Sequence, residues 1–265
     1  MKLEINDVGP ISNANIDISK INVVGGVNSS GKSMISKLLY CYFKSRNEDE
    51  SFEYLMDSEG LDKDLDVTFE GNLNPHDVFY IDNISILDLK DLDILRVDHI
   101  IHIKEALEES DETKESKNID IIQNIIKENC LNTTSSGIKE IGIIELLLKN
   151  NKLKENSFLI IDEPEASLHP EWQIKFAEIL VLLVKDLNIH IYLNSNSPMF
   201  IEAISLYAQY YDLINDTNFY LTQKTADDKF SFRKINPKNM GEVYENLTKP
   251  YDELDKLKAK ILFKE

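Results

Sequence analysis

The chain has 265 residues, of which 42 % are hydrophobic and 29 % charged, and its formal net charge is −18. A chain of this length can bury a substantial core as one large domain or two small ones. The acidic charge disfavours direct binding to DNA, because a polyanion is repelled except at a local basic groove. No apolar run approaches the roughly 20 residues that span a bilayer, and the N-terminus lacks the apolar core of a secretory signal. We therefore expect a cytoplasmic protein without membrane contact.

The first part of the chain predicts a strand, a loop and a helix in succession. Polar and apolar residues alternate at 3–5 and 16–18, and an apolar run at 21–24 then leads into two glycines. This pattern is typical of strands that end in a glycine turn. From 32 to 43, apolar residues recur at three- and four-residue spacing, which indicates a helix with one buried face.

Between that strand and that helix, residues 26–33 fit the phosphate-binding pattern G-x-x-x-x-G-K-[ST] at every fixed position. The glycines let backbone N–H groups turn toward phosphates, Lys32 would reach the terminal phosphates, and Ser33 would ligate Mg²⁺. We expect ATP and Mg²⁺ as cofactors. The expected nucleotide contacts here are Gly26, Asn28, Ser29, Ser30, Gly31, Lys32, Ser33 and Met34.

An acidic pair follows a second buried strand. Residues 158–161 are all apolar, as in a strand that is covered on both faces of a parallel sheet, and Asp162 and Glu163 come directly after them. Carboxylates at the carboxyl end of a central strand would lie near the phosphate loop. Asp162 would supply a hard oxygen ligand to Mg²⁺, and Glu163 would polarise the attacking water. The alternative, a simple turn after the strand, is disfavoured by the phosphate loop.

The remaining elements follow from apolar periodicity and turn residues. We expect short strands at about 78–81 and 189–193 and a hairpin at about 217–235. We expect helices at about 121–126, 138–148, 170–185 and 198–210. The charged segment 104–119 is typical of a solvated helix or loop. A C-terminal helix carries Leu254, Leu257, Ile261 and Leu262 on one side, which would dock another protein or pack on the core.

The sequence Asp-Glu-Pro-Glu-Ala-Ser-Leu-His-Pro at 162–170 resembles the Walker B motif and D-loop of ABC-type ATPases. More narrowly, it resembles the prokaryotic SMC-like and OLD-like AAA-family ATPases of the AAA_21 type. Ser136 and Gly137 resemble the Ser-Gly pair of a degenerate ABC signature, although a simple helix cap is the alternative. In this family the signature contacts the γ-phosphate bound to the opposite subunit. The resemblance therefore implies a homodimer on ATP binding, with His169 at the dimer interface.

The resemblance also implies a fold class. This is an α/β P-loop NTPase fold of the ABC/SMC-head type, with a mostly parallel central sheet, an N-terminal antiparallel strand region and a helical insertion. We expect a single ATPase domain over 1–265, with the insertion at about 99–135 and a C-terminal hairpin and helix at about 215–265. Residues 78–82 occupy the place of the Q-loop strand but contain no glutamine, so the Q-loop residue is unassigned.

The segment Ser-Asn-Ser-Pro at 195–198 stands where relatives commonly have Thr-His-Ser-Pro, whose histidine contacts the γ-phosphate. Asn196 can still hydrogen-bond a phosphate or water, but it has no titratable proton. We therefore expect slow hydrolysis, with Lys32, Glu163 and Asn196 as the catalytic residues. In the alternative, Asn196 only caps the helix that begins at Pro198.

The other polar candidates indicate less. His99 and His102 lack the partners of a metal site and are expected on the surface, whereas Trp172 and the tyrosines are expected in the core. No aromatic residue precedes the phosphate loop to stack on a base, so the choice of ATP over GTP is implied only by the family.

These expectations lead to a functional hypothesis of ATP-driven dimerisation that gates a separate effector, a nuclease or toxin of an anti-phage defence complex. The residues after Asn196 show no Toprim or HNH pattern, so the effector would be another chain, and nucleic acid would be bound only indirectly or through that partner. A DNA-repair or SMC-like ATPase and a nucleotide-locked scaffold are the alternatives. An ATPase subunit of a transporter is less favoured, because the Q-loop glutamine and the switch histidine are missing.

Overall fold

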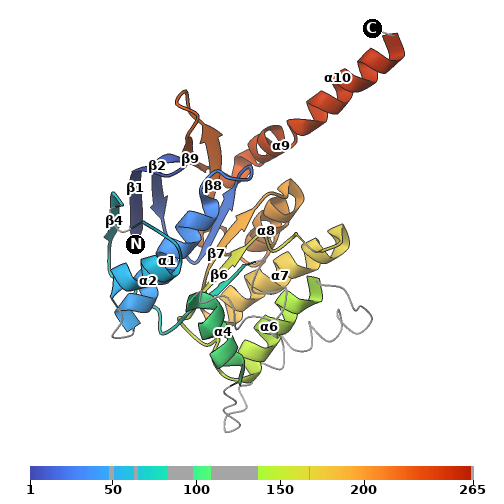
Figure 1. Ribbon diagram of the computed structural model, residues 1–265. Coiled ribbons are helices and arrows are strands. Elements are labelled where there is room, and N and C mark those ends of the chain that lie inside the picture. The colour runs from blue at the N-terminus through green and yellow to red at the C-terminus, as the bar shows by residue number, and fades with distance from the viewer. Residues whose placement is uncertain (48–50, 63–64, 83–97, 109–136, 167, 264–265) are drawn as a thin grey trace.

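A mixed sheet with the strand order β4-β1-β2-β9-β8-β3-β7-β6-β5 runs through this computed structural model (Figure 1). The structure describes all residues except 48–50, 63–64, 83–97, 109–136, 167 and 264–265. The strands are β1 (Lys2–Val8), β2 (Ile11–Asp17), β3 (Ile21–Gly25), β4 (Val67–Glu70), β5 (Val78–Ile81), β6 (Phe158–Asp162), β7 (His190–Ser195), β8 (Thr217–Lys224) and β9 (Phe230–Ile235).

The described helices are α1 (Lys32–Asn47), α2 (Phe52–Ser58), α4 (Asp98–Glu108), α6 (Gly137–Lys149), α7 (Pro170–Leu187), α8 (Pro198–Tyr210), α9 (Gly241–Leu247) and α10 (Pro250–Phe263). Two short 3₁₀ turns cover Ile214–Asp216 and Pro237–Asn239. The helix expected at 121–126 lies outside the described residues, as does most of the expected insertion. No described helix is long and apolar enough to cross a membrane.

The pairing of the strands confirms the expected fold class. The central strands β8, β3, β7, β6 and β5 pair in parallel, whereas β1 pairs antiparallel with both β2 and β4. The hairpin expected at 217–235 is formed by β8 and β9, which are antiparallel. The fold is thus α/β, with an N-terminal antiparallel region beside a mostly parallel sheet.

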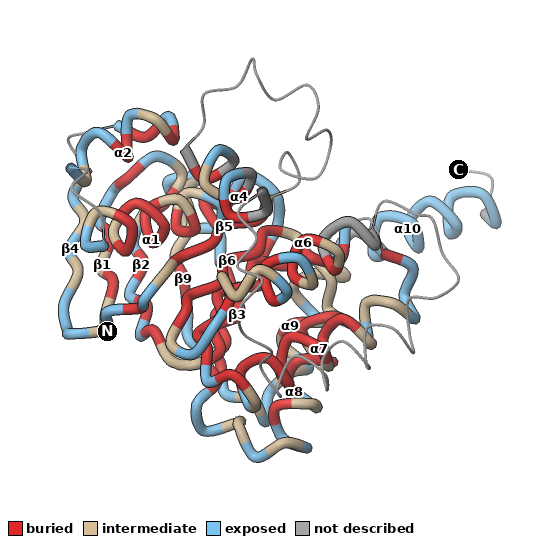
Figure 2. Tube along the Cα trace, turned by 90° about the horizontal axis from the view of Figure 1, so that it is seen from below, coloured by how far each residue is buried: buried red, intermediate tan, exposed pale blue. Residues whose placement is uncertain are grey.

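Two hydrophobic cores cover the two faces of the sheet, and the central strands serve both. In β6, Leu159 and Ile161 join one core, while Phe158 and Ile160 join the other. The first core contains the inner faces of α6, α7 and α8, and the second contains the inner face of α1. Figure 2 shows this buried centre. Because each central strand is covered on both sides, its sequence is an uninterrupted apolar run rather than an alternating one.

The register of the parallel strands brings three chain reversals to one edge of the sheet. Gly25 at the end of β3 is paired with Ser195 at the end of β7, and Asp162 at the end of β6 is paired with Asn194. The loops after these strands must therefore meet at the same edge, which is where ligands bind in open α/β sheets.

The helix α10 projects away from the rest of the molecule (Figure 1). Its apolar residues Leu254 and Leu257 are 50 % and 53 % exposed, and Ile261 and Leu262 are more exposed still. The alternative that this helix packs on the core is therefore wrong. The preceding helix α9 packs against the body of the molecule, and its Val243 is buried in the first core.

Candidate nucleotide-binding site

The loop between β3 and α1 turns tightly because two of its positions have no room for a side chain. A Cβ on Gly26 would lie 2.0 Å from Oγ1 of Thr222, and one on Gly31 would lie 2.5 Å from Cγ1 of Ile11. Gly31 also has a φ of +95°, a backbone conformation that L-residues with side chains rarely adopt. The glycines of the sequence pattern are thus required by close packing as well as by the loop conformation.

Lys32 lies at the first position of α1, and its ammonium group is turned back onto the loop. Its Nζ donates hydrogen bonds to the carbonyl oxygens of Gly26, at 2.9 Å, and Val27, at 2.8 Å. Burial lowers the pKa of Lys32, and the nearby carboxylates of Glu163 and Asp162 oppose that shift. The lysine is therefore held at the loop and can exchange its carbonyl partners for phosphate oxygens.

A cavity of about 410 Å³ opens over the loop. Its lining contains all the predicted loop contacts except Gly26, together with Pro10 from the turn between β1 and β2 and Glu163 from the end of β6. The volume lies within the range of roughly 300–1,000 Å³ that is usual for small-molecule sites. The lining residues are Pro10, Asn28, Ser29, Ser30, Gly31, Lys32, Ser33, Met34 and Glu163.

Asp162 is buried at the end of β6, and three side chains hold its carboxylate. Its Oδ1 accepts hydrogen bonds from Ser36 Oγ at 2.6 Å and Asn194 Nδ2 at 2.5 Å, and its Oδ2 accepts one from Tyr80 OH at 2.9 Å. Burial, and then the charge of Asp162, raise the pKa of Tyr80 well above its usual value, so the phenol stays a donor. A carboxylate held in this way is a hard oxygen donor of the kind that Mg²⁺ prefers.

Sequence reasoning missed these three partners of Asp162. Ser36 follows Lys32 by one helical turn, and Asn194 comes directly after the buried run Ile191–Leu193 of β7. Each is a polar residue in an apolar pattern, which is the signal that could have singled them out. Tyr80 gave no such signal, because a tyrosine in a buried strand is ordinary core.

Glu163 and Asn196 meet directly beside the loop. The amide Nδ2 of Asn196 donates hydrogen bonds to Glu163 Oε1 at 2.6 Å and to Asn28 Oδ1 at 2.7 Å. Glu163 itself has a φ of +54°, which is strained for a residue with a side chain. Strain of this kind persists where the surroundings enforce it, and here the backbone N–H of Glu163 donates to Asn194 O at 2.8 Å.

The structure rejects the alternative that Asn196 only caps α8. The N-cap of that helix is Ser197, whose Oγ accepts a hydrogen bond from the N–H of Phe200 at 3.2 Å. The loop 195–197 is held instead by Glu165, a buried residue whose Oε1 accepts from the N–H groups of Asn196, at 2.6 Å, and Ser197, at 3.1 Å. Burial raises the pKa of Glu165, while the hydrogen bond from Asn196 opposes the shift. Sequence reasoning assigned Glu165 no role.

His169, one of the remaining predicted contacts, is not among the residues that line the cavity. It is exposed and caps α7, where its Nδ1 accepts a hydrogen bond from the N–H of Glu171 at 3.4 Å. Gly137 is the first residue of α6, and Ser136 lies outside the described residues. The structure thus gathers the loop, Asp162, Glu163 and Asn196 in one site, and leaves His169 outside it.

Comparison with known proteins gives a family match over the segment that contains Asp162 and Glu163. Residues 80–197 match the family described as "AAA domain, putative AbiEii toxin, Type IV TA system", the AAA_21 family. This segment contains Asp162, Glu163 and Asn196, and the complete phosphate loop precedes it in the same site. The parallel central strands, with the phosphate loop between β3 and α1, give the chain an α/β P-loop fold.

Several solved structures are similar to this chain. The SMC head domain from Thermotoga maritima is 15 % identical, with a TM-score of 0.48, over 89 % of this chain and 98 % of that chain. CbiO1 from Clostridium perfringens, part of the ABC transporter complex cbiONQ, is 15 % identical, with a TM-score of 0.49, over 91 % and 90 %. MJ1267, an ATP-binding cassette of an ABC transporter in its ADP conformation, is 14 % identical, with a TM-score of 0.48, over 95 % and 96 %. No curated protein matches the sequence.

A buried ion-pair network adjoins the Asp162 site. His99, expected on the surface, is only 1 % exposed, with Nδ1 at 2.7 Å from Glu59 Oε1 and Nε2 at 3.4 Å from Asp82 Oδ2. Burial alone would lower the pKa of His99, but its contacts with Asp82 and Glu59 outweigh that effect and raise this pKa to about 9. The His99 ring also packs on Tyr80, with the ring centroids 4.4 Å apart.

The surface prediction failed for His99 because the sequence does not show which residues the fold brings to it. Glu59 follows α2 and has a fully buried side chain, and only a positive partner can hold such a carboxylate in the interior. His102, also expected on the surface, is half-buried, and its ring stacks on Phe79 with the centroids 5.3 Å apart.

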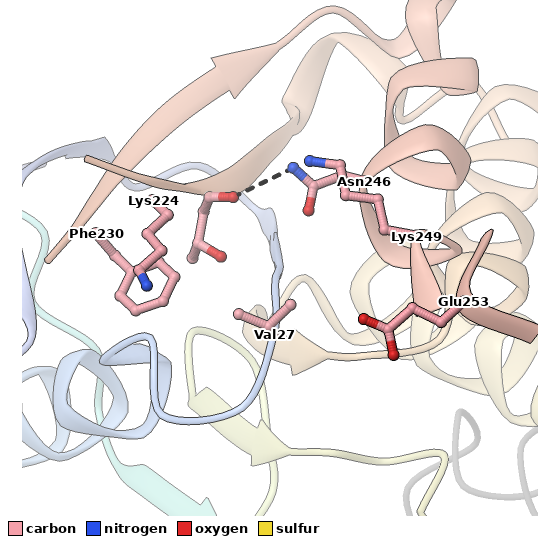
Figure 3. Close-up of a pocket in the computed structure, with 7 residues that line it drawn as sticks. Val27, Lys224, Phe230, Asn246, Lys249 and Glu253 are labelled. Atoms are coloured by element: carbon pink, nitrogen blue, oxygen red, sulfur yellow. Dashed lines mark hydrogen bonds between the residues drawn. The ribbon is translucent and has the colours of Figure 1, made fainter. Parts of the chain in front are cut away.

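A second cavity, of about 530 Å³, lies beside the phosphate loop (Figure 3). Lys224 and Phe230 of the β8–β9 hairpin face Lys249 and Glu253 across it, and Val27 of the loop lies between them. Asn246 Nδ2 donates a hydrogen bond to Thr222 O at 3.5 Å across the same gap. This cavity therefore separates the hairpin from the base of α10.

Proposed function

We propose that this chain binds Mg-ATP in the cavity over residues 28–34 and hydrolyses it slowly. The observation that carries the proposal is the position of Asn196, whose amide bridges the carboxylate of Glu163 and the loop residue Asn28 at 2.6 and 2.7 Å. The residue that departs from the family pattern thus lies between the proposed catalytic carboxylate and the proposed phosphate site.

Each side chain of the site has a task that its geometry supports. Lys32 would leave the carbonyls of Gly26 and Val27 for the terminal phosphates, and Ser33, which lines the cavity, would contact the metal. The buried carboxylate of Asp162 would face the same ion. Its two oxygens already accept three hydrogen bonds, so it would meet Mg²⁺ through a water, and Mg²⁺ commonly keeps several waters in nucleotide sites.

Glu163 would orient the attacking water. Asn196 donates to one oxygen of Glu163, and a carboxylate can accept several hydrogen bonds at once, so Glu163 can also accept one from the attacking water. Asn196 itself can neither accept nor release a proton during the reaction, in contrast to a histidine. The site should therefore hold the water correctly but stabilise the transition state weakly, which is the physical reason to expect slow turnover.

The experiment that tests the enzymatic role replaces Glu163 by glutamine, which keeps the size of the side chain and removes its charge. We expect phosphate release to fall at least about a hundredfold, in keeping with the loss of one positioned catalytic group, while ATP binding persists. Glu171→Gln, a change at an exposed residue outside the cavity, is the matched control. Equal, near-background turnover in the wild type and Glu163→Gln would instead favour a nucleotide-locked scaffold, the second candidate that Asn196 supports.

We further propose that the site is completed by a second copy of the chain. Ser136 and Gly137 resemble a signature that acts on the opposite subunit, and His169 is not among the residues that line the cavity of its own chain. The cavity is open to solvent on the side of Ser33, which is exposed. A homodimer that forms on ATP binding would close it.

The biological role that we propose is the gating of a separate effector in an anti-phage defence complex. The support is the description of the matching family, which names a putative toxin of a toxin–antitoxin system. The effector would be a nuclease or toxin on another chain, with nucleic acid bound through that partner. Purification of the tagged chain from its native operon, with and without ATP, tests this role. A stoichiometric nuclease or toxin supports it, and co-purification with membrane permease subunits contradicts it.

A further inference from the structure

The helix α10 presents an apolar stripe that none of the described residues of its own chain covers. Five of its large apolar side chains are between 50 % and 77 % exposed. Four of them recur at three- and four-residue spacing and the fifth is next to the last of these, so all five lie on one side of the helix. Figure 2 shows the helix exposed along its length. The residues of this stripe are Tyr251, Leu254, Leu257, Ile261 and Leu262. A contiguous exposed stripe of this kind indicates a contact surface.

The charges of α10 are divided between its two halves. Its acidic residues lie in the first half of the helix, and its lysines lie in the second half. They are Asp252, Glu253 and Asp255, followed by Lys256, Lys258 and Lys260. The helix residues over this range are therefore balanced in charge, within a chain whose net charge is −18. This division is a complementary pattern, because a reversed copy of the helix presents lysines where the first presents acids.

We propose that the stripe is covered by α10 of a second copy of this chain, in antiparallel orientation. Antiparallel pairing sets each acidic half against the lysine half of the other copy, whereas parallel pairing sets like charges side by side. It also places the two acidic bodies at opposite ends of the helix pair, where their mutual repulsion is smallest. A two-fold axis near the middle of the helix satisfies both copies at once.

The cavity at the base of α10 fits this arrangement. Glu253 lines that cavity from the first turn of the helix, next to Lys249 and across from the hairpin (Figure 3). With the axis near the middle of α10, Glu253 of one copy lies at the same level along the helix pair as Lys260 of the second copy. The lysine half of the second helix therefore passes the mouth of the cavity, and the pair extends from the helix onto the body of the molecule.

The size of the contact determines its strength. A helix of 14 residues is about 21 Å long, so the pair buries less than the roughly 1,200–2,000 Å² of a standard interface. We therefore expect a weak, concentration-dependent dimer that needs no nucleotide. The α10 dimer can therefore be distinguished from the ATP-dependent dimer proposed above. It should persist in Lys32→Ala, a variant in which ATP binding is impaired.

Sedimentation equilibrium of the full chain without nucleotide tests the proposal. Leu257→Glu places a charge in the stripe of both copies, so we expect dimerisation to weaken at least about a hundredfold. Leu206→Glu is the matched control, because Leu206 is 57 % exposed on α8 while Leu257 is 53 % exposed, and it should dimerise like the wild type. A wild-type chain that stays monomeric at every concentration overturns the proposal, as does equal weakening by both variants.

Orientation is tested separately by disulfide formation. Tyr251→Cys mixed with Leu262→Cys should give a cross-linked dimer, since both positions lie in the stripe and at the same level in the antiparallel pair. Tyr251→Cys alone should not, because its two copies would lie about 16 Å apart along the helix, and a disulfide needs Cα atoms within about 7 Å. The wild type, which keeps its own two cysteines, is the background control. Efficient cross-linking of Tyr251→Cys with itself indicates parallel pairing and overturns the proposal.

Discussion

Asn196 is the residue on which the proposed slow hydrolysis depends most. It donates to Glu163 and to the phosphate loop, and Glu165 holds its backbone from behind. An amide in this place can position a carboxylate, but it cannot carry positive charge toward a phosphate. The slow turnover that we propose is therefore a property of one side chain in an otherwise complete site.

The first prediction concerns this residue. Asn196→His should raise the rate of ATP hydrolysis at least about tenfold, because a histidine next to Glu163 can carry a proton and a positive charge. The ratio of the variant's rate to the wild-type rate should change around pH 6–7, where histidine titrates. Phosphate release across this pH range measures both effects. Asn215→His, at an exposed position, is the control. An unchanged or lower rate would show that Asn196 does not limit turnover.

His99 supplies a second prediction at the scale of single residues. Its pKa is raised from 6.5 to about 9 in the folded chain, so the protonated form stabilises the fold fully below pH 6.5 and this contribution is lost as the pH rises to about 9. The free energy of unfolding should fall by up to ~3 kcal/mol over that interval. The groups that face His99 include Glu59 and Asp82.

Urea denaturation at several pH values measures this dependence. His99→Gln removes the titration, so its stability should be lower than that of the wild type near pH 6 and should change less between pH 6.5 and 9. His76→Gln, at an exposed histidine, is the matched control and should keep the wild-type slope. A wild-type stability that rises with pH over this interval would contradict the raised pKa.

At the scale of elements, the phosphate loop depends on the hairpin that follows much later in the chain. Thr222 of β8 packs against Gly26, and β8 lies next to β3 in the sheet. A strand from the C-terminal part thus forms one wall of the loop. This contact explains why the first position of the loop is a glycine, although the φ of Gly26 is ordinary.

The third prediction follows from this contact. Gly26→Ala should destabilise the chain by about 1–3 kcal/mol, because its Cβ would lie 2.0 Å from Thr222 Oγ1, and ATP binding should weaken as the loop shifts. Combining it with Thr222→Ala should recover part of the loss, as expected for residues in contact. Gly142→Ala, in α6 with nothing within 4 Å of its Cβ, should be neutral or slightly stabilising. Thermal unfolding and nucleotide titration measure the set, and strict additivity of the two changes would refute the contact.

At the scale of the whole molecule, the signature assignment implies that a second copy of the chain closes the open cavity. The fourth prediction is that Ser136→Arg weakens ATP-dependent dimerisation by at least about tenfold and leaves ATP binding to the loop in place. Light scattering with and without ATP measures the mass, and Ser231→Arg on β9 is the control. Dimerisation that is unaffected by Ser136→Arg would remove the signature assignment, and loss of ATP binding by the monomer would place Ser136 in its own site.

Much of this molecule was predictable from local patterns. The loop 26–33, the pair Asp162 and Glu163, the helices α1, α7 and α8 and the β8–β9 hairpin all follow from spacing and turn residues, because backbone sterics and burial act over a few residues. The apolar stripe of α10 was also predictable from the spacing of its residues, but the exposure of that stripe was not.

Tertiary structure alone decided the rest, because those contacts join residues far apart in the chain. Tyr80, Ser36 and Asn194 meet on Asp162 only once the parallel strands are in register, and Glu59 reaches His99 only across two helices. A sequence pattern records which face of an element is buried, but not which polar groups the fold places opposite each other. By itself, the sequence therefore determined the phosphate loop and the acidic pair, and the packing of distant segments determined how Asp162, Glu163 and Asn196 are held.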